Sequence, residues 1–210
     1  MKARIAFLAL TSVALAATAI STMARHRQQS QAERLVNEML VGQRSPDPEL
    51  LRKLGPQALP PLIKALAPAH PVVEEAYDSL PYPLQAGVSK LLPQLLDNQY
   101  RRMNAAAWVG FLGPAAKPAV PFLIKLLKDN FADGNAANSL ALIGPPADEA
   151  VPALLVALQE HRPFAAIALG SIGTPKTVAS ALEKAFQQGP AWQREEARVA
   201  LNKLRARFPG

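Results

Sequence analysis

The stretch LGPAAKPAVPFLIKLL, from Leu112 to Leu127, decides the fold, because close copies of it recur along the chain. The copies are IGPPADEAVPALLVAL (Ile143 to Leu158), IGTPKTVASALEKAF (Ile172 to Phe186) and the shorter LGPQALPPLIKAL (Leu54 to Leu66). The interval of about 30 residues is typical of helical repeats, whose units bury their apolar faces only by stacking on their neighbours. The repeat therefore predicts an all-α fold, and within that class a right-handed α-solenoid.

Each unit predicts two helices joined by a tight turn. The first, which we call the outer helix, ends at a glycine, namely Gly113, Gly144 or Gly173. A glycine at this place accepts left-handed backbone geometry, and the proline one or two residues later cannot continue the helix. The second, the inner helix, has proline in its first turn, as at Pro121 and Pro152, where a missing N–H costs nothing.

Small residues fall in register when the outer helices are aligned on their terminal glycines. Two neighbouring columns hold only alanine, which lets helices pack at the short end of the usual range of about 8–10 Å. Trp108 stands in an adjacent column of otherwise small residues, so its ring either fills a gap in the core or projects to a surface as an anchor, and its place among core columns favours burial. The alanine columns are Ala105, Ala136 and Ala165, and then Ala106, Ala137 and Ala166.

The domain boundaries follow from the extent of the repeat. Residues 44–208 are expected to form the repeat domain, with about five helix pairs and a charged capping helix from Trp192 to Phe208. Residues 25–43 predict an amphipathic helix that stops at Gly42, followed by a linker. The pairs are predicted at residues 44–67, 71–97, 98–130, 132–160 and 161–188, with a kink at Pro93.

Residues 1–24 carry the parts of a signal peptide or signal anchor. Lys2 and Arg4 precede an uncharged stretch at residues 5–24, and a basic cluster, Arg25 to Arg27, follows it. As a helix this stretch would span about 30 Å, which is enough to cross a bilayer. Both interpretations predict an exported protein, periplasmic if the segment is cleaved and membrane-anchored if it is retained. A buried first helix is the third interpretation, although the repeat begins only after Gln43.

The repeats resemble HEAT repeats, in particular the short bacterial HEAT-like repeats named after phycobilisome lyases. The resemblance rests on FAAIALGSIG, GPAAKPAVPFLIKLL and GPPADEAVPALLVAL, and on Arg102, Arg162 and Arg194, which stand at equivalent places before the glycine column. It implies a curved solenoid that acts as a protein-binding scaffold, with the inner helices lining its concave face. Asp133 and Val156 depart from the family's arginine and lysine positions, which argues against a continuous polar ladder along one face.

The inner-helix lysines are the candidate partner-binding residues. Two interpretations of them remain open: a basic stripe that meets an acidic partner, or ordinary solvated positions on amphipathic helices. Val156 interrupts the row and favours the second interpretation. The formal net charge of +7 is modest and does not by itself indicate a nucleic-acid partner. The candidates are Lys64, Lys125, Lys128 and Lys184.

The sequence predicts no catalytic, cofactor-binding or metal-binding residues. It contains no cysteine, and His26, His70 and His161 are isolated from one another, without the spacings of zinc sites. We therefore expect a non-enzymatic, monomeric protein-interaction scaffold of the cell envelope that works without a cofactor. The alternatives are a nucleic-acid-binding HEAT-like protein, which the dispersed basic residues disfavour, and a lyase-type enzyme by family analogy alone.

Overall fold

The computed structural model describes residues 27, 29, 31–67, 76, 79–91, 93–129 and 132–209, and every regular element among them is helical. The predicted all-α class is confirmed for this part of the chain. A helix over residues 31–40 ends at Gly42, as predicted, and precedes the labelled elements. These are α2 (Pro48–Leu54), η1 (Gly55–Ala58), α3 (Leu59–Leu66), α5 (Tyr82–Leu91), α6 (Pro93–Val109), η2 (Gly110–Ala119), α7 (Val120–Leu126), α8 (Asp133–Ile143), η3 (Pro145–Ala150), α9 (Val151–Gln159), α10 (Ala165–Ile172), α11 (Pro175–Gln188) and α12 (Ala191–Arg207).

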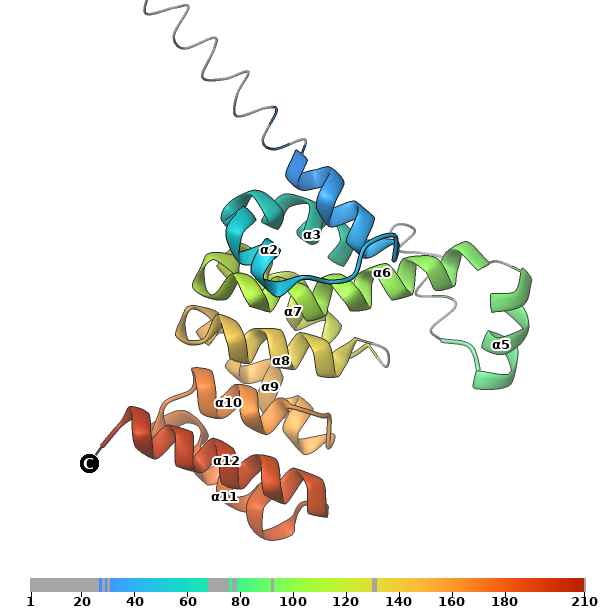
Figure 1. Ribbon diagram of the computed structural model, residues 1–210. Coiled ribbons are helices and arrows are strands. Elements are labelled where there is room, and N and C mark those ends of the chain that lie inside the picture. Colours follow the sequence, from blue (N-terminus) through green and yellow to red (C-terminus); the bar gives the residue numbers. More distant parts are fainter. Residues whose placement is uncertain are drawn as a thin grey trace, which may run out of the picture.

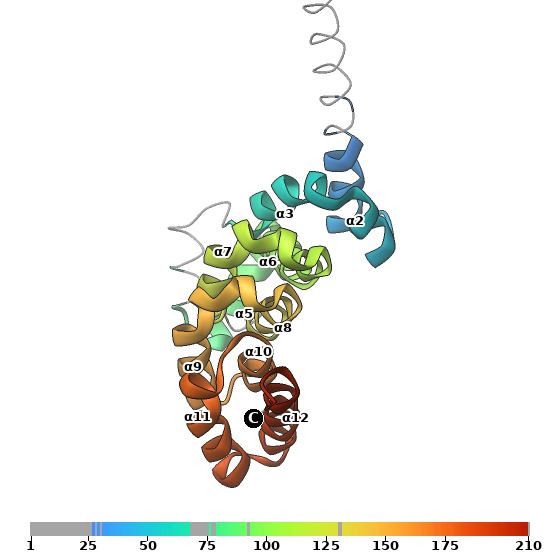
Figure 2. The same cartoon turned by 90° about the vertical axis from the view of Figure 1, so that its left-hand side faces the viewer.

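The helices form two layers in which successive units stack on one another (Figures 1 and 2). In the outer-helix layer α6 contacts α8, α8 contacts α10, and α10 contacts α12. In the inner-helix layer α7, α9 and α11 follow one another along the other side of the stack (Figure 2). The arrangement is therefore repeat-like, with each of the first three outer helices followed by the inner helix of its own unit.

The outer helices approach one another closely because small residues line their contacts. The six alanines of the predicted columns are all fully or almost fully buried. A Cβ atom added to Gly110 would lie 2.7 Å from the Cα of Ser139, and one added to Gly170 would lie 2.6 Å from the Cα of Ala200. Backbone therefore meets backbone between adjacent outer helices. Trp108 is buried among these contacts, which confirms its predicted place in the core.

Two of the three predicted turn glycines, Gly113 and Gly144, adopt a conformation that only glycine tolerates well, and so does Gly55 in the first copy of the repeat. Gly55, Gly113 and Gly144 have φ values of 56°, 57° and 75°, with ψ values of −135°, −138° and −149°. These angles combine a positive φ with an extended ψ, so they differ from the left-handed helical geometry that we predicted. In each case the following residue is proline, and the chain enters a 3₁₀ helix before the inner helix begins.

Gly173 is the exception among the turn glycines. Its φ of −69° and ψ of 172° are extended, so the prediction of a left-handed geometry is wrong here. The turn is made instead by a capping box in which Thr174 and Thr177 exchange backbone and side-chain hydrogen bonds at the start of α11. A larger residue does not fit at position 173, since an added Cβ atom would lie 2.5 Å from the Cγ1 of Val178.

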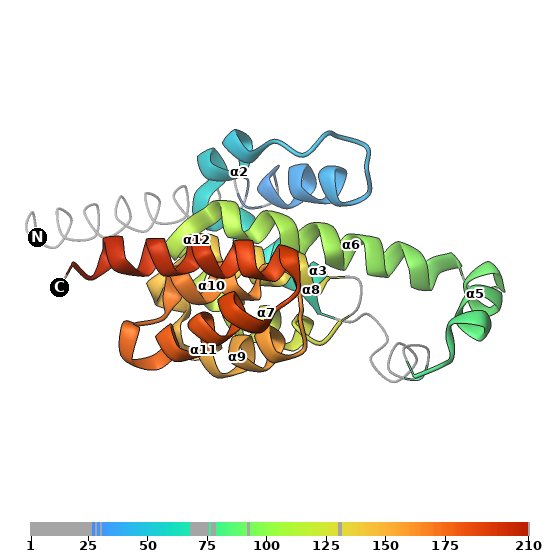
Figure 3. The same cartoon turned by 90° about the horizontal axis from the view of Figure 1, so that it is seen from below.

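The predicted boundary between the second and third helix pairs, at residues 97 and 98, is not present. Helix α6 runs without a break from Pro93 to Val109, and Pro93 is its first residue and not a kink within a helix. Proline favours the first turn of a helix, and no glycine or proline follows it until Gly110. Helix α5 lies beside the start of α6 and outside the stack (Figures 1 and 3).

The capping helix α12 uses part of its charge to hold α10. Nζ of Lys203 donates to Oγ of Ser171 at 2.8 Å, and Nη1 of Arg207 donates to the carbonyl oxygens of Gly170 and Gly173, both at 3.0 Å. Cations are favourable at the carbonyl end of a helix, where the backbone oxygens lack partners. The high charge that the sequence shows in this segment is therefore partly structural.

One helical run in the described residues, Gln99–Leu126, is long and apolar enough to cross a membrane by length and composition alone. The run includes Gly113, whose backbone angles are not helical, so the chain turns within it. The run consists of the end of α6, η2 and α7, and 39% of its most apolar window is buried inside the protein. The predicted signal or anchor, residues 1–24, lies outside the described residues.

Candidate functional site

The four candidate lysines are all exposed. Lys64 lies on α3, Lys125 on α7, Lys128 just after α7, and Lys184 on α11. None of the four has an ion-pair or hydrogen-bond partner in the part of the chain that the structure describes. Their charges are therefore available to a binding partner, and the question is which of them share a surface.

Three of these lysines lie on or beside adjoining elements that also carry Lys117. Helix α3 contacts both η2 and α7, and these three elements contain Lys64, Lys117 and Lys125 and no aspartate or glutamate. Lys128 lies two residues after the end of α7. We call Lys64, Lys117, Lys125 and Lys128 the lysine surface. Sequence reasoning missed Lys117 because it lies in the turn and not on an inner helix. The sequence holds one indication that this position is exposed, since Lys117 aligns with another charged residue, Asp148, in the next copy of the repeat.

The nearest carboxylate along the chain does not neutralise this surface. Asp129 follows Lys128 directly, but its Oδ2 atom pairs with Nη2 of Arg102 on α6 at 2.9 Å. The two side chains are only 11% and 7% exposed, so the pair is formed inside the protein. An ion pair held in this way leaves little negative potential at the surface. Asp129 therefore does not compensate the lysines, and the exposed carboxylates of an adjoining element are Asp148 and Glu149 on η3, which contacts η2 and α7.

Lys184 is separate from the lysine surface. Helix α9 lies between α7 and α11 in the inner-helix layer (Figure 2), and it presents Val156, which is 47% exposed. The predicted row of lysines is thus interrupted at the residue that the sequence indicated. Lys184 lines a pocket at the C-terminal end of the stack instead.

Two of the three repeating arginines, Arg102 and Arg162, join helices, whereas Arg194, on α12, is exposed. Arg102 pairs with Asp129 inside its own unit. Arg162 reaches back to the preceding outer helix, where its Nη1 atom lies 3.2 Å from Oδ2 of Asp133. Asp133 stands where the arginine of its own unit is expected, and it pairs instead with Arg162, the arginine of the next unit. These two paired arginines stabilise the stack and are not candidates for binding.

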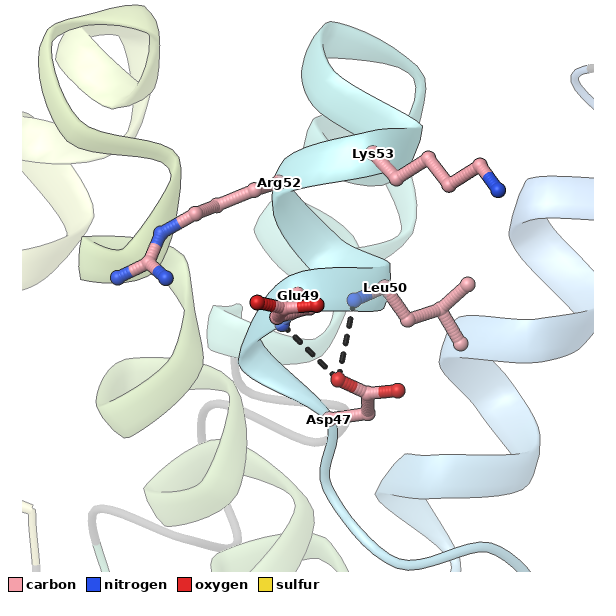
Figure 4. A pocket seen from close by; sticks show the side chains of 5 residues that line it. All are labelled: Asp47, Glu49, Leu50, Arg52 and Lys53. Atoms are coloured by element: carbon pink, nitrogen blue, oxygen red, sulfur yellow. Dashed lines mark hydrogen bonds between the residues drawn. The ribbon is translucent and has the colours of Figure 1, made fainter.

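A shallow pocket of about 460 Å³ at the start of α2 holds a helix cap and not a binding site (Figure 4). Oδ1 of Asp47 accepts hydrogen bonds from the backbone N–H groups of Glu49 at 2.9 Å and Leu50 at 3.1 Å. This is the usual role of aspartate at a helix N-terminus. Arg52 and Lys53 point to opposite sides of α2, so no charged groups converge on one point (Figure 4).

A second pocket, of about 600 Å³, lies between α9, α11 and the start of α12, and we call it the C-terminal pocket. Lys184 and His161 both line it, together with the buried Gln193. Nε2 of Gln193 donates to the carbonyl oxygen of Leu158 at 2.6 Å, and its Oε1 lies 2.7 Å from Nδ1 of His161. Sequence reasoning set His161 aside as isolated, because its partner lies 32 residues away. His26 and His70 lie outside the described residues.

Burial raises the pKa of Glu196, on α12, above its ordinary value of 4.5. A hydrogen bond from the backbone N–H of Phe164 to Oε1, at 3.1 Å, acts in the opposite direction but has the smaller effect. The carboxylate Oε2 atom is buried and has no hydrogen-bond partner. Glu196 thus holds the loop before α10 while its own charge is poorly solvated.

Comparison of the chain with protein-family models, with curated proteins and with solved structures found no match. Among the described residues, no group of three or more histidine, aspartate or glutamate side chains is arranged to hold a metal ion. The inference of function therefore depends on the surfaces and pockets described above.

Proposed function

We propose that the chain is a right-handed α-solenoid of HEAT-like repeats that serves as a non-enzymatic, monomeric protein-interaction scaffold of the cell envelope. The stacked layers of outer and inner helices and the recurring glycine–proline turns support the solenoid architecture. A preformed surface of this kind loses little conformational entropy on binding, so a few contacts can provide affinity. The scaffold needs no cofactor.

The lysine surface is the single observation that carries the proposed function. Three exposed lysines lie on three adjoining elements and a fourth, Lys128, follows α7, and those three elements contain no carboxylate. Such a surface attracts and orients an acidic protein segment and excludes basic ones. We therefore assign the partner-binding role to Lys64, Lys117, Lys125 and Lys128, and we remove Lys184 from that group.

Residues 5–24 and the basic residues on either side of them are the basis for proposing export. In this proposal the segment either is cleaved, which leaves a periplasmic protein, or stays as a membrane anchor. Amino-terminal sequencing of the mature protein, together with its distribution between membrane and soluble fractions, distinguishes the two outcomes. A mature protein that starts at Met1 and stays in the cytoplasm would contradict both.

Charge reversal tests the binding role directly. The full chain, immobilised as bait, is expected to capture one acidic protein from an envelope extract. The variant Lys64→Glu/Lys125→Glu/Lys128→Glu is expected to lose that same protein. Lys176→Glu is the matched control, since Lys176 is also exposed but lies at the start of α11. Capture that is unchanged in the triple variant, or lost in the control, would overturn the assignment.

A nucleic-acid partner is the competing function for a basic surface. Single-stranded nucleic acids also need exposed aromatic side chains on which bases can stack. The exposed aromatic residues of the described chain lie elsewhere, on α6, α11 and α12 and near the ends of α10 and α12, and none lies on α3, η2 or α7. Binding of DNA or RNA that weakens steeply with salt, and that the triple variant abolishes, would favour this function over a protein partner.

A further inference from the structure

The C-terminal pocket combines one positive charge with a small apolar wall. Its volume of about 600 Å³ falls in the range of about 300–1,000 Å³ that is typical of ligand pockets. Lys184 is the one formally charged side chain among the described residues that line it. Leu158, Ala181 and Ala185 provide apolar surface, and the short alanine side chains leave room for an apolar group.

His161 presents a hydrogen-bond acceptor at this pocket. The amide nitrogen of Gln193 donates to the carbonyl oxygen of Leu158, so its oxygen faces Nδ1 of His161. An amide oxygen only accepts, so the hydrogen-bond network assigns the proton of the neutral imidazole to Nδ1. The other ring nitrogen, Nε2, then carries a lone pair. No hydrogen bond occupies it in the described part of the protein.

The loop that carries His161 is held in a strained conformation. His161 and Phe164 have φ values of 56° and 60°, and they are the only residues other than glycine with positive φ in the described chain. Bulky side chains rarely adopt such angles, which persist only where surrounding contacts impose them. Here α12 provides the contacts, because Gln193 binds His161 and Glu196 binds the backbone of Phe164. The position of the imidazole is therefore fixed before any ligand arrives.

Neighbouring carboxylates do not cancel the charge of Lys184. Glu160, at the end of α9, is paired with Nε of Arg162 at 3.4 Å. Glu183 precedes Lys184 on α11 but does not line the pocket. The pocket thus offers a cation, a fixed acceptor, the amides of Gln159 and Gln188, and an apolar wall.

We infer that the C-terminal pocket binds the free carboxy-terminus of a peptide chain whose last side chain is apolar. The terminal carboxylate pairs with Lys184, a backbone N–H donates to Nε2 of His161, and the last side chain packs on Leu158, Ala181 and Ala185. The glutamine amides can serve both the donors and the acceptors of the peptide backbone. This contact is separate from the lysine surface, so it goes beyond the proposed function.

A pair of peptides that differ in one group tests this inference. Acetyl-Ala-Leu, with a free carboxylate, and its carboxamide are titrated into the full chain, and NMR follows the side chains of His161 and Lys184. The carboxylate form is expected to bind at the pocket, with the carboxamide about three- to tenfold weaker, because an exposed charge pair contributes only modestly. Lys184→Met, which keeps the apolar stem, is expected to lose the same factor, and Lys176→Met on the same helix to lose nothing.

Three outcomes would overturn the inference. They are equal affinity for the two peptides, shifts confined to another surface, and no saturable binding up to about 10 mM, which is weaker than a specific site would give. Each of these results leaves the capture experiment on the lysine surface unaffected. Failure of the pocket and failure of the proposed function can therefore be told apart.

Discussion

The outer and inner helices share one repeat but use their residues differently. Outer helices meet through alanine, serine and glycine, and their backbones touch at Gly110 with Ser139 and at Gly170 with Ala200. Inner helices pack one side into the core and present lysine, glutamine and valine to solvent on the other. A substitution in the outer-helix contacts is therefore expected to change the stability of the fold, whereas one on the exposed inner side is expected, under the proposed function, to change what the protein binds.

The largest expected effect follows from filling an outer-helix contact. Gly170→Val places a branched side chain where even a Cβ would lie 2.6 Å from the Cα of Ala200. We expect the free energy of unfolding to fall by about 3 kcal/mol, the upper part of the usual range for overpacking. Urea denaturation measures the change. Gly87→Ala, on α5, is the matched control, since nothing lies within 4 Å of its added Cβ. The control should be neutral or slightly stabilising, and equal effects for both would contradict the close-contact argument.

A smaller effect is expected at the turns between the layers. Gly113→Ala forces a side chain into a φ of 57° with a ψ of −138°, although no atom lies within 4 Å of the new Cβ. The conformational strain alone should lower the free energy of unfolding by about 2 kcal/mol. Gly55→Ala, at an equivalent turn, should behave alike under the same denaturation assay. If the free energy of unfolding fell by less than about 0.5 kcal/mol in both variants, the turns would be able to relax, which would contradict the account of strain at these glycines.

The next effect concerns pH and the contact of α12 with the loop before α10. Because burial raises the pKa of Glu196, its carboxylate destabilises the folded protein at neutral pH, and this penalty disappears as the pH falls below the unfolded value of 4.5. Glu196→Gln should therefore raise the free energy of unfolding at pH 7 by about 0.5 kcal/mol or less, since the side chain is partly solvated. The difference from the unsubstituted protein should vanish near pH 4. Greater stability of the unsubstituted protein at pH 7 would contradict the sign.

The smallest effect on stability is expected on the inner side. Charge reversal at Lys64, Lys125 and Lys128 should change the free energy of unfolding by no more than about 0.5 kcal/mol, because these side chains are exposed and unpaired in the described chain. The free energy of unfolding of this variant is compared with that of Gly170→Val in the same denaturation assay, which shows whether the inner and outer layers differ in their contribution to stability. A loss comparable to that of Gly170→Val would mean that the lysines support the fold.

The sequence predicts the outer layer well because packing repeats with the chain. Alanine columns and glycine turns recur at each unit, so three copies define one another. The predicted left-handed geometry is wrong at Gly173 because glycine is needed there for a different reason. A Cβ atom would collide with Val178, and the repeat pattern does not reveal this contact. The predicted kink at Pro93 is also wrong. Proline can either start a helix or kink one, and the sequence alone does not distinguish the two; in the structure Pro93 starts α6.

The candidate sites are less predictable because they depend on distances between units. Sequence reasoning identifies Lys64, Lys125 and Lys128 by their repeat positions, but it also includes Lys184, which the intervening α9 separates from them. It misses Lys117, which reaches the lysine surface from a turn. The C-terminal pocket depends on Gln193 meeting His161 across 32 residues, and neither residue belongs to a motif.

Lysine acetylation with and without the captured partner is the most direct test of the central claim, that the inner side of α3, η2 and α7 is the binding surface. Mass spectrometry would compare the modification of each lysine in the free chain and in the complex. The lysine surface, Lys64, Lys117, Lys125 and Lys128, is expected to be protected in the complex, while Lys176 stays as reactive as in the free chain. Equal modification of those four residues in the free and bound chain would contradict the claim.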